Sequence, residues 1–279
     1  MIAQSWVKKQ VFSMTLSQIK KVLDRKRLRL NRNQIVDYLM ALLEQQVLHR
    51  HYKSVHAKQS CGVGYAAFMH GMGLVAPLWR HLEHKYRQDH AIGFDDLTIA
   101  DSSLLPSKNE QSITRKDWKN GNATVRPDHK ICGEKCLTLI NSRKQIVTNQ
   151  LMPNINSPDD HVFKQPMQWA RKGLRFGHLL VDRGFSNKAV RLGIDFLTNA
   201  LPDYSLGLIS PPRARQTWVL TPEQTLLYKK RWQIEEVFRQ LKDPQGRFRM
   251  VMCGVRRRPL REARVAIATL AWNMEHAIA

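Results

Sequence analysis

The spacing of apolar and polar residues predicts helices in the first third of the chain. Thr15 and Gln18 have the spacing of an N-terminal capping box, and apolar residues recur at helical intervals over residues 19–23. A second helix is expected after Asn33, because the apolar side chains that follow it fall on one face: Ile35, Leu39, Leu42, Leu43 and Val47. Residues 62–79 are apolar but include four glycines and a proline, a composition that favours a buried helical hairpin over a membrane span.

The periodicity changes near residue 93, where strand patterns begin. Short strands are predicted over residues 96–100, 136–140, 145–151, 178–181 and 204–209. Residues 107–130 are predicted to be a long polar connector. Helices are predicted from residue 157, over 187–197, from Thr221 and over 259–279. A strand meander followed by alternating strands and helices indicates an α/β fold with a mixed sheet covered by helices. We therefore expect a helical region over residues 1–92 and a second domain over 93–279.

Composition and charge narrow the function. The chain has 279 residues, 43% of them hydrophobic, which is enough for a core, and a net charge of +22. This charge makes nucleic acid the leading partner and an acidic membrane surface the second. The basic run 25–29 lies between the first two predicted helices, where it could enter a DNA groove, although a solvated face of a helical bundle explains it equally well. Four cysteines do not indicate a disulfide scaffold, and residues 1–10 show no secretory signal, so a cytoplasmic location is expected.

Two aspartates are predicted at the carboxyl ends of strands, where open α/β sheets place their sites. They are Asp101, after the first strand, and Asp182, after the fourth. Either one alone is weak support for a site, because strand-end aspartates often form turns. At about 100° per residue, four polar residues of the helix that begins near Thr221 share one face: Tyr228, Arg231, Glu235 and Lys242. Glu235 is expected beside the apolar stripe of this helix and shielded from water.

These residues have one ordinary and one functional interpretation. An amphipathic helix in which Glu235 pairs with Arg231 or Lys242 accounts for the helix charges, but it leaves both aspartates unexplained. Three carboxylates brought together are hard oxygen ligands suited to Mg²⁺. A pair of such ions roughly 3.5–4 Å apart can serve phosphodiester chemistry.

The helix motif Tyr-x2-Arg-x3-Glu-x6-Lys resembles the signature helix of bacterial insertion-sequence DDE transposases. Upstream, Val-Asp-Arg-Gly-Phe at residues 181–185 is similar to the family's segment with the second aspartate, and Ile-Ala-Asp-Ser at residues 99–102 resembles the first. The resemblance covers roughly residues 93–275 and implies a ribonuclease-H-like mixed sheet flanked by helices. The helical N-terminal region shows no specific resemblance, and its expected DNA-binding role rests on charge and analogy. The short interval between Asp182 and Glu235 leaves no room for the large insertion domain of some relatives.

The resemblance implies a role for each residue of the motifs. The catalytic carboxylates, which would hold two Mg²⁺ ions with Mn²⁺ as a substitute, would be Asp101, Asp182 and Glu235. The residues that contact the transposon end and its phosphates would be Tyr228, Arg231 and Lys242. The implied reaction is cleavage at the ends of an insertion sequence, followed by attack of the freed 3′-hydroxyl on target DNA. The expected partners are double-stranded DNA, at the element ends and the target, and a second copy of the chain when two ends are paired. A bacterial, nucleoid-associated location follows, with no membrane.

Two rival functions fit the same residues. One is a Mg²⁺-dependent DNA nuclease on the same fold that never joins strands. The other is a transposase-derived protein that only binds DNA. Three further residues, His129, Cys132 and Cys136, fall short of a zinc signature. Trp118 lies among basic residues, where it could stack on an unpaired base or pack on the domain edge.

Overall fold

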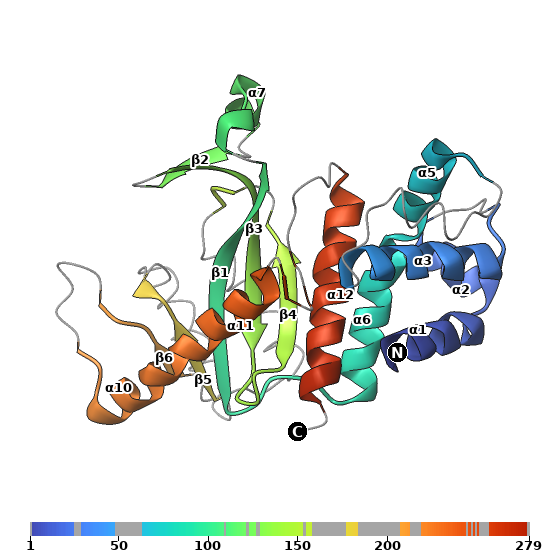
Figure 1. Cartoon of the computed structure of the whole chain (residues 1–279). Helices are drawn as coiled ribbons and strands as arrows, with labels where there is room; N and C mark the ends of the chain where they lie inside the picture. The colour runs from blue at the N-terminus through green and yellow to red at the C-terminus, as the bar shows by residue number, and fades with distance from the viewer. Residues whose placement is uncertain are drawn as a thin grey trace. The chain divides into compact units, whose positions relative to one another are not determined.

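The computed structural model describes most of the chain and divides it into two compact units. The described residues are 2–24, 29–47, 63–108, 110–120, 123–126, 129–152, 155–157, 177–183, 207–212, 219–243, 245–246, 248, 250 and 257–277. The helical unit comprises residues 1–91 and 240–279, and the sheet unit comprises residues 92–239 (Figure 1). The helices predicted from residue 157 and over 187–197 lie outside the described residues, as do residues 25–28 of the basic run and residues 204–206 of the last predicted strand.

Six described helices form the helical unit. They are α1 (Ile2–Ser13), α2 (Leu16–Val22), α3 (Arg32–Val47), α5 (Tyr65–Val75), α6 (Pro77–Asp89) and α12 (Arg258–His276). The predicted capping box at α2 is confirmed, because Thr15 Oγ1 accepts from the Gln18 amide and Gln18 Oε1 accepts from the Thr15 amide. Helix α1 was not predicted. Its fully buried apolar positions, Val7 and Val11, are one turn apart and separated by polar residues, which is a weak periodic signal.

The apolar segment 62–79 is helical, as predicted, but it is not a hairpin with a loop. Helices α5 and α6 meet at Ala76, and Pro77 is the first residue of α6, where its missing N–H costs nothing. Gly71 lets the ring of Tyr38 on α3 approach closely, since a Cβ at this position would lie 2.3 Å from the ring. No helix among the described residues is long and apolar enough to cross a membrane.

The last helix packs within the helical unit. The predicted helix over residues 259–279 corresponds to α12, which contacts α6 and α3. The amide nitrogen of Gln46 on α3 donates to the carbonyls of Phe248 and Arg264, each at 2.9 Å. Trp272 is fully buried and packs against Phe248. These contacts explain why residues 240–279 group with the N-terminal helices, whereas the sequence placed this segment in the domain over 93–279.

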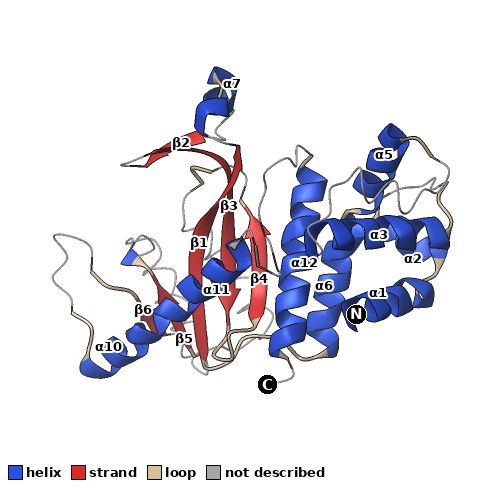
Figure 2. Ribbon diagram, viewed as in Figure 1, coloured by secondary structure: helices blue, strands red, loops and turns tan. Residues whose placement is uncertain are grey.

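The sheet is mixed, as the sequence predicts. Its strands are β1 (Leu97–Lys108), β2 (Ala123–Arg126), β3 (His129–Ile140), β4 (Ile146–Leu151), β5 (His178–Val181) and β6 (Gly207–Ile209) (Figure 2). Strand β3 pairs antiparallel with β1 on one edge and with β2 and β4 on the other. Strands β5 and β6 extend the sheet in parallel beyond β1. An antiparallel meander joined to parallel strands, with flanking helices, is the ribonuclease-H-like α/β arrangement expected from the resemblance.

The segment 107–130 is the main departure from the predicted elements. The first strand continues past Ala100, through the polar residues 101–103, to Lys108, because nearly all of its length pairs with β3. A 3₁₀ turn, η1 (Glu110–Ser112), and a short helix, α7 (Arg115–Lys119), follow before β2. The prediction of a long polar connector therefore missed the helix and strands in this segment. The sequence showed only the polar composition, whereas the strands here form by backbone pairing of β3 with β1 and with its neighbour β2.

The helix predicted after Thr221 is interrupted by one 3₁₀ turn. It consists of α10 (Pro222–Tyr228), the 3₁₀ turn η4 (Lys229–Arg231) and α11 (Trp232–Lys242). The hydroxyl of Thr221 accepts from the Gln224 amide and completes a capping box. The predicted apolar stripe of α11 is buried: Ile234, Val237, Phe238 and Leu241. Helix α11 crosses one face of the sheet (Figure 1).

Candidate active site

The register of β1 and β5 places two aspartates at equivalent points on adjacent strands. The parallel pairing runs from Leu97 opposite His178 to Ala100 opposite Val181. Asp101 and Asp182 are the next residues along the two strands. Asp182 follows the last residue of β5, as predicted. Asp101 was expected at the end of its strand. It lies within β1 instead, at the point where the parallel pairing with β5 stops.

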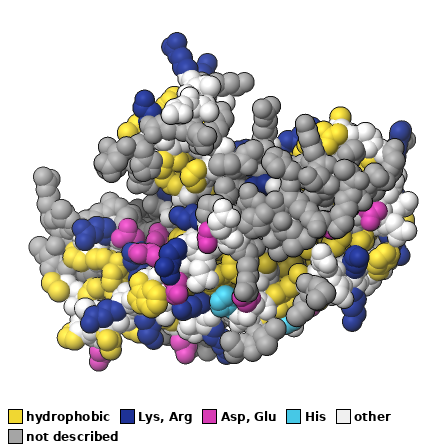
Figure 3. Space-filling model, in the orientation of Figure 1, with side chains coloured by type: hydrophobic (Ala, Val, Ile, Leu, Met, Phe, Trp, Pro, Cys, Tyr) yellow, Lys and Arg dark blue, Asp and Glu magenta, His cyan; other side chains and the backbone are white. Residues whose placement is uncertain are grey.

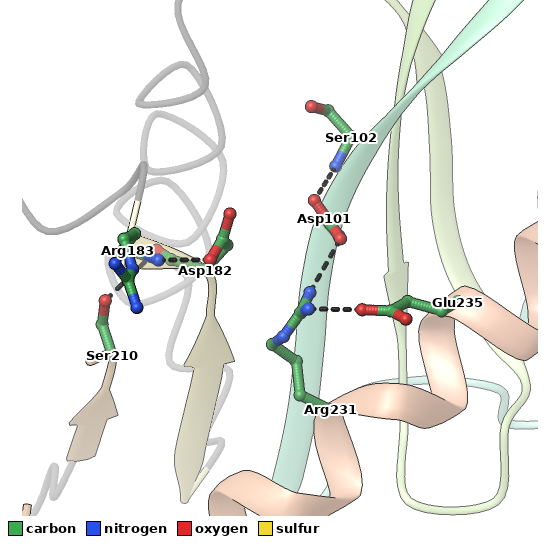
Figure 4. Close-up of polar contacts among 7 residues, drawn as sticks. All are labelled: Asp101, Ser102, Asp182, Arg183, Ser210, Arg231 and Glu235. Atoms are coloured by element: carbon green, nitrogen blue, oxygen red, sulfur yellow. Dashed lines mark hydrogen bonds and ion pairs between the residues drawn. The ribbon is translucent and has the colours of Figure 1, made fainter.

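Each aspartate is oriented by its own backbone. Asp101 Oδ1 accepts from the amide of Ser102 at 2.7 Å, and Asp182 Oδ1 accepts from the amide of Arg183 at 2.7 Å (Figure 4). The backbone of Asp182 is also held in place, because the hydroxyl of Ser210, next to β6, donates to the carbonyl of Asp182 at 3.2 Å. One oxygen of each carboxylate is thus held at the strand, and the other is directed away from this amide.

Arg231 joins two of the three predicted carboxylates. Its Nη1 donates to Oδ2 of Asp101 at 2.9 Å, and its Nη2 donates to Oε1 of Glu235 (Figure 4). The side chains of Arg231 and Asp101 are 19% and 20% exposed, whereas that of Glu235 is 58% exposed. The helix pattern predicted that Glu235 is shielded from water. This prediction was wrong, because the side chain is largely exposed. Its position one turn after Arg231 fits the pairing that the ordinary interpretation of the helix expected.

Tyr228 lies in the same electrostatic environment. Its ring centroid is 6.0 Å from the Arg231 guanidinium carbon. Burial raises the pKa of the Tyr228 phenol, and Asp182 and Asp101 add to this effect, while Arg231 opposes it. Burial alone would lower the pKa of Arg231, but Tyr228, Asp101, Glu235 and Asp182 together raise it above its ordinary value. Tyr228 is thus a neutral phenol and Arg231 a cation at neutral pH.

The arrangement brings together five of the six residues predicted for the site. Contacts join Tyr228, Arg231, Asp101 and Glu235 directly, and Asp182 acts on Arg231 and Tyr228 through its charge. Figure 3 shows acidic and basic side chains side by side on this face of the sheet unit. Lys242 is the last residue of α11, half-buried, and falls in the helical unit.

A comparison with protein families identifies the sheet unit and part of the helices beyond it. The family model described as a transposase DDE domain matches residues 92–274. The chain belongs to this DDE transposase family. No curated protein matches the chain. Its membership implies DNA binding and a transposition activity, and DDE transposases use divalent metal ions.

The carboxylates of this DDE transposase suit a divalent metal in their chemistry. Aspartate and glutamate oxygens are the ligands that Mg²⁺ prefers. Within the described residues, no group of three or more His, Cys, Asp or Glu side chains is arranged to hold a metal ion. Instead, Asp101 and Glu235 already share one cation, the guanidinium of Arg231. The chemistry of these carboxylates, two of which already pair with a cation, is compatible with a divalent metal ion.

Some features of the site have no signal in the sequence. Lys144, which follows the turn after β3, pairs with Glu236 on α11 at 2.9 Å, and its Nζ lies 5.3 Å from the centroid of the Trp232 ring. Lys144 and Glu236 are 92 residues apart in the sequence, and neither belongs to a motif that would predict this contact. Lys144 anchors α11 to the sheet one residue away from Glu235.

The other candidate residues from the sequence, two cysteines and a tryptophan, lie outside the cluster of carboxylates. Cys132 and Cys136 are free, buried thiols on β3, and Cys136 Sγ donates to Asn149 Oδ1 at 2.7 Å. Trp118 on α7 is 40% exposed. Arg115 and Lys119, on the same short helix, are also exposed, and Lys and Arg side chains project at this end of the sheet unit in Figure 3. This end thus combines positive charge with an accessible aromatic ring, the combination that stacks on unpaired bases.

Proposed function

We propose that the chain is an insertion-sequence transposase that cleaves phosphodiester bonds at the ends of its element and transfers the 3′-hydroxyl ends to target DNA. The catalytic carboxylates in this proposal are Asp101, Asp182 and Glu235. The observation that carries it is the contact of Arg231 with Asp101 and Glu235, because it joins the signature helix to the first aspartate. Asp182 is adjacent to Asp101 in the register of β1 and β5.

The proposed cofactor is a pair of Mg²⁺ ions, for which Mn²⁺ can substitute, held by the three carboxylates. When bound, such ions activate the attacking oxygen and stabilise the leaving oxygen of phosphoryl transfer. The chain's own residues would orient these ligands: the amides of Ser102 and Arg183 fix one oxygen each of Asp101 and Asp182. Lys144 holds the helix that carries Glu235 by pairing with its neighbour Glu236.

Two of the three proposed DNA contacts, Tyr228 and Arg231, lie next to these carboxylates. Arg231 carries a planar guanidinium that matches a phosphate in two hydrogen bonds. The Tyr228 phenol is neutral at neutral pH, and burial raises its pKa further, so its hydroxyl can donate to a phosphate oxygen. Lys242 supplies a further positive charge at the end of α11. We also propose that the helical region over residues 1–92 binds DNA and that two copies of the chain act together when two ends are paired.

A strand-joining assay separates this proposal from its rivals. The full chain is incubated with Mg²⁺, a supercoiled target plasmid and a labelled duplex that ends in the element's own 3′-hydroxyl terminus. A transposase joins the labelled strand to the plasmid. A nuclease of the same fold cuts the DNA without joining it. A protein that only binds DNA shifts the duplex in a gel but leaves both DNAs intact.

Replacement of Lys242 by alanine is expected to weaken binding to the element end. The loss of one phosphate contact should also reduce the slope of log affinity against log salt concentration by about 1. Fluorescence anisotropy with a labelled duplex at several salt concentrations measures both quantities. Arg258→Ala is a matched control, because Arg258 pairs with Glu262 on the surface of α12, outside residues 1–92. An unchanged salt slope in Lys242→Ala would remove Lys242 from the DNA contacts.

A further inference from the structure

Arg231 holds together two residues from distant parts of the chain. Asp101 on β1 is 130 residues away from Arg231 in sequence, yet its carboxylate accepts from Arg231 Nη1 at 2.9 Å. Glu235, one helical turn after Arg231, accepts from Nη2 (Figure 4). Both Arg231 and Asp101 are about four-fifths buried, so this ion pair is screened less than one at the surface. The guanidinium therefore fixes the distance between the two carboxylates.

A metal ion and Arg231 require the same carboxylate oxygens. The two oxygens that face each other, Oδ2 of Asp101 and Oε1 of Glu235, are the ones that accept from Arg231. Mg²⁺ binds its oxygen ligands at about 2.0–2.1 Å, which leaves no space for a guanidinium between them. A divalent cation beside the guanidinium would also repel it. Arg231 and a metal ion that bridges these carboxylates cannot both be in this position.

DNA offers Arg231 a different partner. A phosphate accepts two parallel hydrogen bonds from a guanidinium, and such pairs are among the strongest in proteins. Arg231 needs only a change in its side-chain rotamers to exchange carboxylates for a phosphate, because its backbone lies in the turn η4 beside the site.

We propose that Arg231 is a positioning residue that keeps Asp101 and Glu235 together in the DNA-free protein and gives up its place to a divalent cation when a DNA phosphate binds its guanidinium. This inference rests on the proposed function, since it takes Asp101 and Glu235 as metal ligands. Metal binding and DNA binding are then coupled. By linkage, each raises the affinity for the other by the same factor. The protein without DNA has little affinity for metal, which limits cleavage to DNA that is correctly bound.

Mn²⁺ binding to the full chain tests this coupling without any measurement of activity. The concentration of free Mn²⁺ is followed by electron paramagnetic resonance, with and without a saturating duplex that carries the element end, and binding to the duplex alone is subtracted. The variants are Arg231→Met, which keeps the length of the side chain but removes its charge, and Lys230→Met, which removes a neighbouring exposed charge. Circular dichroism establishes that each variant is folded, and anisotropy establishes that the duplex is bound.

The expected result is specific to Arg231. In the wild type, the duplex raises Mn²⁺ affinity by about 5-fold or more, the lower end of typical coupling between sites. Arg231→Met binds Mn²⁺ more tightly than the wild type without DNA, by a similar factor, and loses most of the dependence on the duplex. Lys230→Met behaves as the wild type does. Equal Mn²⁺ affinity of Arg231→Met and the wild type in the absence of DNA would overturn the inference.

A further variant separates failure of this inference from failure of the proposed function. Glu235→Gln removes one of the proposed metal ligands. If Glu235→Gln abolishes a Mn²⁺ site that Arg231→Met leaves unchanged, the metal site stands and only the role of Arg231 is wrong. If neither the wild type nor any variant binds Mn²⁺ with the duplex present, both the inference and the proposed metal site are wrong.

Discussion

Replacement of Glu235 by glutamine is expected to abolish DNA cleavage while leaving DNA binding intact or tighter. The amide keeps the size of the side chain but removes one of three proposed anionic ligands, so cleavage should fall by at least about 10²-fold. Binding should persist because the change removes a negative charge that faces the phosphates. Single-turnover cleavage of an end-labelled duplex, measured beside its binding affinity by anisotropy, gives both values.

The next residue along α11 provides a matched control for this prediction. Glu236 has the same side chain, pairs with Lys144 at 2.9 Å and is not among the proposed ligands. Glu236→Gln keeps a side-chain oxygen that can accept from Lys144, so α11 should stay in place and the cleavage rate should remain within a few-fold of the wild type. If Glu235→Gln loses DNA binding and cleavage in equal measure, Glu235 has a structural role through its contact with Arg231. If both variants lose cleavage equally, the result gives no support to Glu235 as a metal ligand.

Replacement of Ile234 by alanine is expected to produce a large loss of stability. Ile234 is completely buried on α11, next to Glu235. Removing its side-chain carbons leaves a cavity, and such changes lower the free energy of unfolding by about 2–5 kcal/mol. Urea denaturation followed by circular dichroism measures this loss.

An apolar residue on the neighbouring helix α10 serves as the control. Leu226 is 66% exposed, so Leu226→Ala should change the free energy of unfolding by no more than about 0.5 kcal/mol. A small loss in Ile234→Ala, similar to that of Leu226→Ala, would mean that the buried stripe of α11 does not hold the helix on the sheet unit. The position of Glu235 would then need another explanation.

The parts of the fold that sequence predicts well are those set by local patterns. The capping box at Thr15, the helix start at Thr221, the strand over residues 178–181 and the buried stripe of α11 depend on residues within a few positions of one another. The length of β1 could not be predicted, because the polar residues 101–103 interrupt its apolar pattern and the strand continues past them by pairing with β3. Helix α7 and strand β2 were missed within the segment 107–130, because each is too short to show a periodic pattern.

The candidate site shows the same division. Helical spacing correctly placed Tyr228, Arg231 and Glu235 near one another, since all three lie within about two turns. The same spacing could not show how far Glu235 is exposed, which depends on the shape of the surface around α11. Nor could it show that Arg231 reaches Asp101 on β1, a contact that exists only once the helix lies on the sheet. Proximity of the carboxylates was expected, but an arginine between two of them was not.

Cleavage of DNA that carries the element's own ends tests the central claim most directly. The labelled duplex is incubated with the wild type or with Asp182→Ala, in Mg²⁺ or in EDTA. We predict cuts at the element ends that require Mg²⁺ and disappear in Asp182→Ala, while both proteins bind the duplex. Tight binding with no cleavage by either protein, even with Mn²⁺ and paired ends, would contradict the account and indicate a transposase-derived protein that only binds DNA.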